Sequence, residues 1–320
     1  MGDIAATLPT YYGLSNRARK ERGNYICKTG FGYGKIFRTN ESAAAIYQRY
    51  DMLEHLASAG FDQTDRIFLS KQNTPYINLG RETYVMTRYI TGQELDFDNI
   101  DHVTLALKSL ANFHKHAREL KLDHPPAQAP PLFDAWKKQE TQLEQALKQA
   151  NRASRLSDFD VLVIKNASYY AELAAAAGKA LKQTDYTKLQ DQAIKKGCIC
   201  HNTMKEENFP IMDGVCYITR ITEPSLDLQL TDLANFIRRY ARRSTREISI
   251  TEHIKIYNSI NTLPPTAEDI IRAQLIYPWQ FIKVVKQYYN KKRGWTPIAL
   301  MSRMKSVLEE QVTFAEYIAF

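Results

Sequence analysis

The stretch HNTMKEENF, from His201 to Phe209, decides how the rest of the chain is interpreted. It begins with a histidine and places Asn208 at the spacing of a phosphotransferase catalytic loop, His-x-Asp-x-x-x-x-Asn. In such loops the aspartate orients or deprotonates the attacking hydroxyl, and the asparagine binds magnesium. Thr203 stands at the aspartate position here. The segment therefore indicates the layout of a phosphotransferase loop without its base.

The sequence upstream of this loop predicts a small lobe rich in strands. Alternating β-formers in RGNYICKTGFGYGKIFR (22–38) predict two strands around a glycine-rich turn. The stretch 39–60 predicts a helix capped by Thr39 or Asn40 and ended by Gly60. The stretch 66–90 predicts three short strands. We therefore expect a β-rich lobe over residues 1–90, followed by a hinge at TGQEL (91–95).

The rest of the chain, 96–320, predicts a larger helical lobe. Apolar residues recur at helical spacing from Val103 to Phe113. Further helices are expected at 134–155, 158–180, 184–196, 232–243, 248–260, 267–292 and 298–318. A catalytic-loop-like hairpin at 198–223 interrupts them, with its turn at IMDG. The fold class expected is α+β, in the two-lobe arrangement of protein-kinase-like phosphotransferases.

Composition and charge limit the class of protein. Of 320 residues, 44% are apolar and 24% charged, which is typical of a globular chain. No apolar run reaches the roughly 18 residues of a membrane span, so no membrane partner is expected. The first residues lack the basic and apolar pattern of a secretion signal. The spacing Cys198-Ile-Cys200 is not that of a zinc site, so we expect reduced thiols.

Several segments together resemble the CotS-type spore coat protein family, relatives of aminoglycoside phosphotransferases and choline kinases with a protein-kinase-like fold. The resemblance rests on RGNYICKTGFGYGKIF, YDMLEHLASAGF, TYVMTRYITGQELDFDN, LALKSLANFHKHA, CICHNTMKEENF, SLDLQLTDLANFIRRY and YPWQFIKVVKQYYNKKRGW. It implies a spore coat component that is made in the mother cell cytoplasm and deposited on the spore, where its partners are other spore coat proteins.

The resemblance also places the residues that phosphoryl transfer needs. The strand lysine falls near Phe37 or Arg38, and Lys35 replaces it only with a change of register. Glu41 is the only acid in the first two turns of the partner helix. The catalytic aspartate falls on Thr203, which has no charge and no useful basicity. The loop asparagine is retained as Asn208.

The metal-binding aspartate falls on Arg220 or Thr222, and an arginine opposes a dication at that place. Glu223 is the one acid that would rescue metal binding. We therefore expect Thr203 and Arg220 to be degenerate positions and Lys35, His201, Asn208 and Glu223 to be remnants of a nucleotide cleft. His201 is interpreted as a structural loop residue, and Asp227 and Asp232 as structural residues too.

The interpretation is a pseudokinase with no metal and no cofactor, acting through surface contacts. The alternative is an active small-molecule phosphotransferase with unusual catalytic residues, which would use ATP and Mg²⁺. A weaker alternative is a basic nucleic-acid-binding protein, since the net charge is +8 and the pI about 9.1. No nucleic-acid module is recognised, so nucleic acid is not expected. A basic run suits a solvated face or an acidic partner: Arg238, Arg239, Arg242, Arg243 and Arg246.

Overall fold

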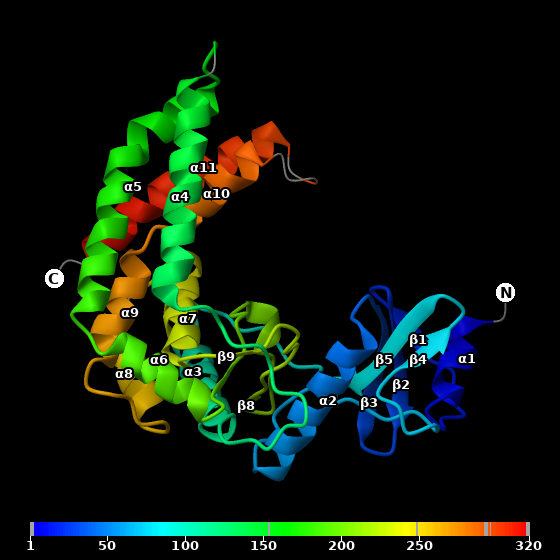
Figure 1. Ribbon diagram of the computed structural model, residues 1–320. Helices are drawn as coiled ribbons and strands as arrows, with labels where there is room; N and C mark the ends of the chain where they lie inside the picture. The colour runs from blue at the N-terminus through cyan, green and yellow to red at the C-terminus, as the bar shows by residue number, and fades with distance from the viewer. Residues whose placement is uncertain (1–2, 153, 248, 291–293, 295, 318–320) are drawn as a thin grey trace. The chain divides into compact units, whose positions relative to one another are not determined.

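The computed structural model describes residues 3–152, 154–247, 249–290, 294 and 296–317, and Figure 1 traces the chain. The predicted helical positions 153, 248, 291–292 and 318 lie outside these residues. The chain forms two compact units. The first, here called the sheet unit, comprises Met1–Gln128, Ala193–Gln229 and Glu252–Thr262. The second, here called the helical unit, comprises Ala129–Gln192, Leu230–Thr251 and Leu263–Phe320.

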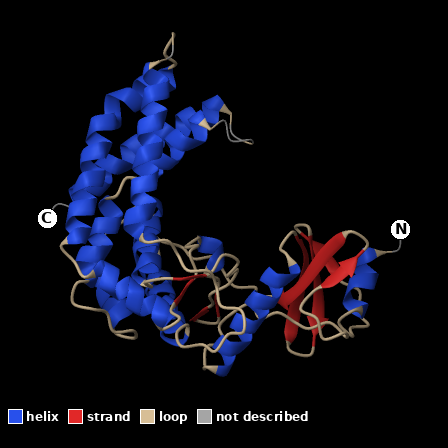
Figure 2. Ribbon diagram, viewed as in Figure 1, coloured by secondary structure: helices blue, strands red, loops and turns tan. Residues whose placement is uncertain are grey.

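The sheet unit is built on a five-stranded antiparallel sheet (Figure 2). Its spatial order is β1-β2-β3-β5-β4. The strands are β1 (Arg19–Glu21), β2 (Asn24–Thr29), β3 (Gly32–Thr39), β4 (Ile77–Leu79) and β5 (Glu82–Arg88). The two strands predicted within 22–38 are confirmed as β2 and β3. Of the three strands predicted within 66–90, the first is wrong, because Ile67 makes only an isolated bridge to Thr87.

Helix α1 (Ile4–Thr10) closes one face of this sheet, although the sequence did not predict it. It has only seven residues and includes Pro9, so its periodicity is too short to identify. Asp3 caps it by accepting a hydrogen bond from the Ala5 N–H at 3.1 Å. The core beneath it is formed by Leu8, Ala18, Cys27, Ile36, Ile77, Tyr84 and Met86.

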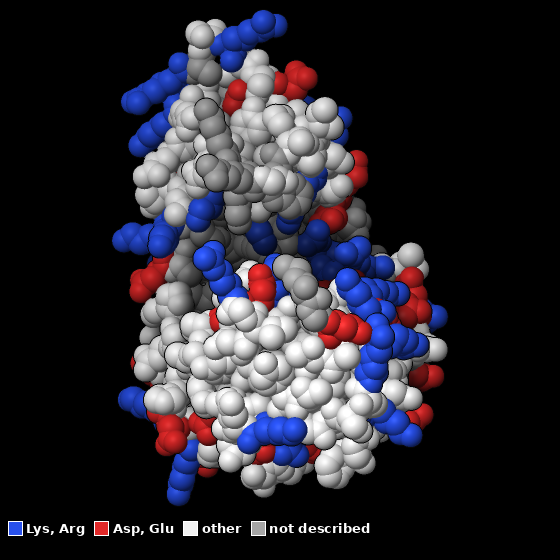
Figure 3. Space-filling view, turned by 90° about the vertical axis from the view of Figure 1, so that its right-hand side faces the viewer, with Lys and Arg blue, Asp and Glu red and all other residues white. Residues whose placement is uncertain are grey.

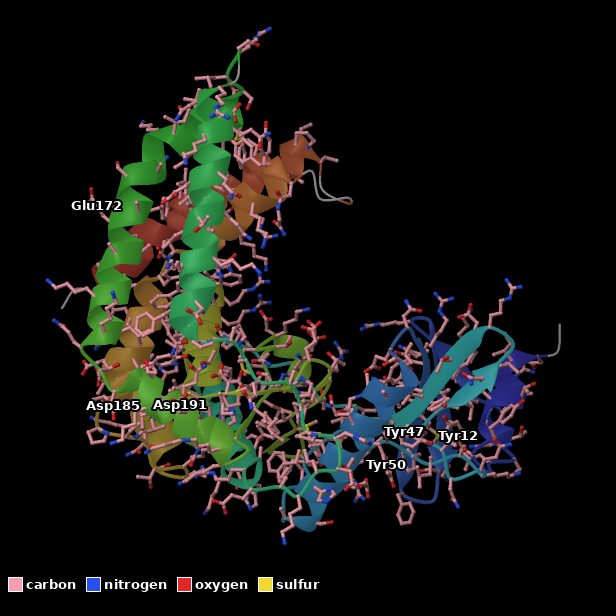
Figure 4. The ribbon with its side chains drawn as sticks, in the orientation of Figure 1. Tyr12, Tyr47, Tyr50, Glu172, Asp185 and Asp191 are labelled. Atoms are coloured by element: carbon pink, nitrogen blue, oxygen red, sulfur yellow. The ribbon has the colours of Figure 1, made fainter. Side chains whose placement is uncertain are left out.

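Helix α2 (Ala43–Ser58) follows β3 and confirms the helix predicted at 39–60. The cap is Ser42 rather than Thr39 or Asn40, since the Ser42 hydroxyl accepts from the Ala45 N–H at 3.2 Å. Apolar residues at helical spacing bury one face of α2 in the unit. On its other side lies Tyr47, which is labelled in Figure 4. Its ring meets that of Tyr76 edge-on, with 6.0 Å between the ring centroids.

The sheet unit also contains the hairpin region and the helix that supports it. Helix α3 (Ile100–His116) precedes β6 (Ile199–Cys200), and β6 pairs with β9 (Ser225–Leu226). The hairpin β7 (Ile211–Met212) and β8 (Val215–Cys216) turns at Asp213-Gly214, where both φ angles are positive. This confirms the turn predicted at IMDG. Strand β6 lies within the segment 198–223 expected to interrupt the helices, and β9 lies just beyond it.

The helical unit consists of helices that match the predicted segments. They are α4 (Leu132–Asn151), α5 (Asp158–Lys182), most of α6 (Tyr186–Lys195), α7 (Leu230–Arg243), α9 (Ala267–Ile276), α10 (Trp279–Tyr289) and α11 (Pro297–Tyr317), while α8 (Ile250–Asn258) lies mostly in the sheet unit. The segment 267–292 is divided into α9 and α10 at Pro278, because proline cannot donate the helical hydrogen bond. Stacked rings hold α5 to α10 through Tyr170 and Phe281, 3.8 Å apart.

The fold class predicted from the sequence is confirmed. The chain combines a five-stranded antiparallel sheet with a larger helical part, which makes it an α+β protein. The lobes expected at 1–90 and 96–320, with a hinge at 91–95, are a different division from the compact units and stay a prediction. All four cysteines are buried thiols: Cys27, Cys198, Cys200 and Cys216. Among the described residues, no helix is at once long and apolar enough to cross a bilayer.

Candidate functional site

The sheet unit contains a cavity of about 400 Å³, here called the Asp65 cleft. Strand β3, the segment after α2, the residues that follow β5 and the hairpin region all contribute to its wall. Its charged side chains are Arg19, Glu21, Arg22, Lys35, Asp65, Arg88, Glu94, Glu207 and Arg220. Figure 3 looks at the chain from the side of the sheet and shows basic side chains gathered at one edge of a broad uncharged face.

Lys35 enters the cleft from the middle of the sheet. It lies on β3 and pairs with Thr87 of β5, so strands on both sides fix its position. Its Nζ atom lies 5.3 Å from the centroid of the Phe37 ring, on the same face of the strand. Burial lowers the pKa of Lys35, and Asp65 opposes this effect. Lys35, which the sequence analysis expected to be a remnant of a nucleotide cleft, therefore lines the cavity from its own position on β3.

Asp65 is the residue at the centre of the site that sequence reasoning missed. Its buried carboxylate accepts the backbone N–H of Arg220, with distances of 3.1 and 3.2 Å to its two oxygens. Burial raises the pKa of Asp65, against the opposing charges of Lys35 and Arg49. No motif surrounds Asp65 in the sequence. Only its place directly after a predicted helix and before a strand was a signal.

The helix beside Lys35 presents an arginine rather than a carboxylate. Arg49 of α2 is buried, and its Nη2 atom lies 2.8 Å from Glu41. Glu41, the acid considered for Lys35, is thus paired with Arg49. The carboxylate that interacts with Lys35 comes instead from the segment that follows α2.

The loop that begins at His201 has the internal bonds of a rigid turn. His201 is buried, its Nε2–H donates to the Thr219 carbonyl at 2.9 Å, and its Nδ1 accepts the Thr203 N–H at 3.2 Å. The Asn208 amide donates to the Thr203 carbonyl at 2.9 Å. Thr203 and Asn208 therefore lie on one loop, as predicted. Neither is among the residues that line the cleft.

Arg220 lines the cleft, and its assignment as a degenerate metal position stays a prediction. Its φ of 58° is in the left-handed region, and the bond to Asp65 fixes this turn. Its Nη1 atom lies 3.3 Å from Glu207, and both side chains are partly exposed. Thr219, which sequence analysis did not single out, lines the cleft beside it.

Glu223 lies outside the lining of the cleft. Its carbonyl accepts from the Asn202 amide at 2.8 Å, so its backbone contributes to the loop. Asp227 and Asp232 are both buried, and Asp227 accepts the Leu228 N–H at 2.7 Å. Asp232 lies in the first turn of α7, where a carboxylate suits the helix dipole.

Two members of the basic run are engaged inside the helical unit. Arg238 donates to the Gln274 carbonyl at 2.5 Å, and its guanidinium lies 5.9 Å from the centroid of the Trp279 ring. Arg242 contacts Glu310 at 2.7 Å. The prediction of an acidic partner at this run stays a prediction. Arg243 and Arg246 are its exposed members.

The family model described as "Spore coat putative kinase YutH" matches residues 5–319. The chain belongs to this spore coat family. The resemblance found in the sequence is thereby confirmed. No curated protein matches the chain.

Solved structures show the fold of this YutH-family chain. An aminoglycoside phosphotransferase from Alicyclobacillus acidocaldarius has a TM-score of 0.84 at 17% identity, over 97% of this chain and 92% of that one. The AMP-bound spectinomycin phosphotransferase APH(9)-Ia has a TM-score of 0.67 at 13% identity, over 97% of each chain. A choline/ethanolamine kinase family protein from Mesorhizobium loti has a TM-score of 0.56 at 12% identity, over 98% of this chain and 96% of that one. The YutH-family chain therefore has the kinase-like fold of aminoglycoside phosphotransferases.

The residues of the Asp65 cleft do not fit the magnesium ion that this fold implies. Among the residues that the structure describes, no group of three or more His, Cys, Asp or Glu side chains is arranged to hold a metal. Glu207 is paired with Arg220, and Asp65 with the Arg220 N–H. Magnesium prefers a shell of oxygens and is repelled by cationic side chains of the cleft, among them Lys35 and Arg220.

Proposed function

We propose that this chain is a catalytically degenerate member of its family, a spore coat structural or assembly component that acts through protein–protein contacts. It is made in the mother cell cytoplasm and then deposited on the spore, with other coat proteins as partners. Membership of the spore coat family supports the location.

One observation carries the degenerate assignment: Arg220 lines the cleft where a metal ligand would be required. Phosphoryl transfer is mostly positioning and neutralisation of charge, and it relies on carboxylates that hold the metal and orient the hydroxyl. Thr203 stands at the loop position of the carboxylate that orients the hydroxyl. Its hydrogen bonds to His201 and Asn208 are made by its backbone N–H and carbonyl. Threonine has neither the charge nor the basicity for that role, so on this proposal Thr203 supplies no base and Arg220 no metal ligand.

A second candidate function, an active phosphotransferase, is favoured by one residue. Glu207 lies on the loop between Thr203 and Asn208 and lines the cleft. A carboxylate at that place has the chemistry of a general base, although it is paired with Arg220 at 3.3 Å.

A phosphotransfer assay separates the two candidates. We expect the purified chain, given ATP, Mg²⁺ and a panel of small alcohols and amines, to form ADP no faster than the Glu207→Gln variant. A general base contributes about 10²–10⁴-fold to a rate, so an active enzyme would lose most of its activity in that variant. ADP formation that falls by such a factor in Glu207→Gln would establish the active candidate instead. Arg38→Gln is the matched control, because Arg38 is exposed on β3 and lies outside the cleft.

A further inference from the structure

The inner wall of the Asp65 cleft places Lys35 and the backbone of Arg220 at one carboxylate. Asp65 accepts the Arg220 backbone N–H through both oxygens and interacts electrostatically with Lys35. The segment before Asp65 is bonded to the residues that lead into Arg220, since the Ile218 N–H donates to the Gln63 carbonyl at 2.9 Å. The charge of Arg220 also acts on Lys35. The backbone of Arg220 is therefore fixed near Lys35 before any ligand arrives, which lowers the cost of binding.

The guanidinium of Arg220 is held only weakly by its present partner. Its 3.3 Å contact with Glu207 joins side chains that are 50% and 38% exposed, and exposed ion pairs contribute little. A phosphate carries more charge than a carboxylate and accepts two parallel hydrogen bonds from one guanidinium. A phosphate group is thus able to displace Glu207 from Arg220.

We propose that the Asp65 cleft binds a chain of phosphate groups directly, as a free anion, with Lys35 and Arg220 as its ligands and no magnesium ion. Arg220 supplies the positive charge that a metal supplies in an active phosphotransferase. The volume of about 400 Å³ is within the usual size of small-molecule sites. Arg22 and Arg88 at the same cleft add positive charge for further phosphates. This binding activity goes beyond the proposed structural role, which needs no ligand.

Magnesium is expected to oppose this binding. A magnesium ion and Arg220 compete for the same phosphate oxygens, and the cleft offers the bound ion no set of carboxylates. The sign of the magnesium effect is therefore opposite to that in a metal-dependent phosphotransferase.

The test is a calorimetric titration of the purified chain with inorganic tripolyphosphate in EDTA, repeated with excess magnesium. We expect binding in EDTA, a rise in Kd when magnesium is added, and a rise of roughly tenfold or more in Arg220→Gln, the range for loss of a charged hydrogen bond. The side chain of Arg220 is half exposed and Asp65 contacts only its backbone, so this variant retains the fold-stabilising bond. Arg81→Gln, at an exposed arginine between β4 and β5 that lies outside the lining of the cleft, should leave Kd unchanged.

Two further arms make the result decisive. Arg220→Asp creates a carboxylate in the cleft, and its tripolyphosphate binding should strengthen with magnesium rather than weaken. ATP in EDTA identifies the natural source of the phosphates: equal Kd values assign the phosphate chain alone, and a tighter Kd for ATP assigns a nucleotide. Binding that requires magnesium in the wild type, or a Kd that neither Arg220→Gln nor Lys35→Met changes from the wild-type value, overturns the proposal. ADP formation in the phosphotransfer assay bears on the proposed function and leaves this titration unaffected.

Discussion

At the scale of single residues, Asp65 is the carboxylate that interacts with Lys35, whereas the sequence offered Glu41 for that role. The resemblance implies that the strand lysine has its partner on the following helix, where Glu41 is the only acid in the first two turns. The structure pairs Glu41 with Arg49 and gives Lys35 a carboxylate from the next segment. Arg220 was predictable because it falls at a position of the family pattern, and Lys35 because it lies two residues from the expected lysine, on the same face of the strand. Asp65 was not, because its position depends on tertiary pairing of 63–65 with 218–220.

The raised pKa of Asp65 makes a prediction about stability and pH. Because its folded pKa lies above its ordinary value of 3.8, the folded state binds more protons than the unfolded state in the window between the two. The free energy of unfolding contributed by Asp65 therefore falls as pH rises through this window. We expect Asp65→Asn to remove that decline, so that the wild type loses stability relative to the variant as pH increases. Urea denaturation at closely spaced pH values above 3.8 measures the difference.

The control for this experiment is internal, because the comparison is of slopes and not of absolute stability. Asparagine retains an oxygen that accepts the Arg220 N–H but leaves Lys35 without the charge of Asp65. The whole stability curve of the variant is therefore displaced, and only its slope against pH is compared. Stability curves that stay parallel across the window would contradict the assignment.

At the scale of elements, alternation and glycine placement were enough to predict β2, β3, the Asp213-Gly214 turn and the long helices. Short elements, whose stability depends on packing, were not predicted correctly. Helix α1 and strand β1 were missed, and the strand expected from residue 66 is only an isolated bridge. The boundary between α9 and α10 follows directly from Pro278, a signal that was present in the sequence. Local pattern therefore predicts long elements, and tertiary contact decides the short ones.

Gly92 lies where the residues that follow β5 contact the β7–β8 hairpin. The neighbouring Gln93 exchanges two backbone hydrogen bonds with Ile211, of 2.8 and 2.7 Å. A Cβ atom at Gly92 would lie 2.4 Å from the Ile211 carbonyl oxygen, which is backbone and has no room to move. We expect Gly92→Ala to cost about 1–3 kcal/mol of unfolding free energy, measured by urea denaturation followed by circular dichroism.

Gly30→Ala is the matched control, because a Cβ atom there meets no atom within 4 Å. We expect its effect to stay within about 0.5 kcal/mol. Equal losses in the two variants would show that the close approach at Ile211 is unimportant.

At the scale of the whole molecule, the two compact units carry different spectroscopic reporters. Of the three tryptophans of the sequence, Trp136 and Trp279 lie in the helical unit, and Trp295 lies outside the described residues. The fluorescence of Trp136 and Trp279 therefore follows the helical unit, whereas circular dichroism follows both units. Arg238 is the matching site of perturbation, since it donates to the Gln274 carbonyl within that unit.

We expect Arg238→Met to lower the fluorescence midpoint of urea unfolding by leaving the Gln274 carbonyl unpaired, at a cost of about 1–3 kcal/mol. Gly92→Ala should leave that midpoint unchanged and act only on the dichroism. If each variant shifts both signals together, the chain unfolds as one cooperative body and the separation of the units is wrong.

The burial of the four cysteines has a chemical consequence. Burial raises the pKa of Cys27 to about 11 and that of Cys216 to about 12. A thiol reacts with electrophiles and disulfides as its thiolate, a form that these two residues hardly populate near neutral pH. In the folded state Cys27 and Cys216 are therefore expected to react slowly with thiol-directed oxidants and alkylating reagents. A covalent link between chains through either of these two sulfur atoms would require the chain to open first.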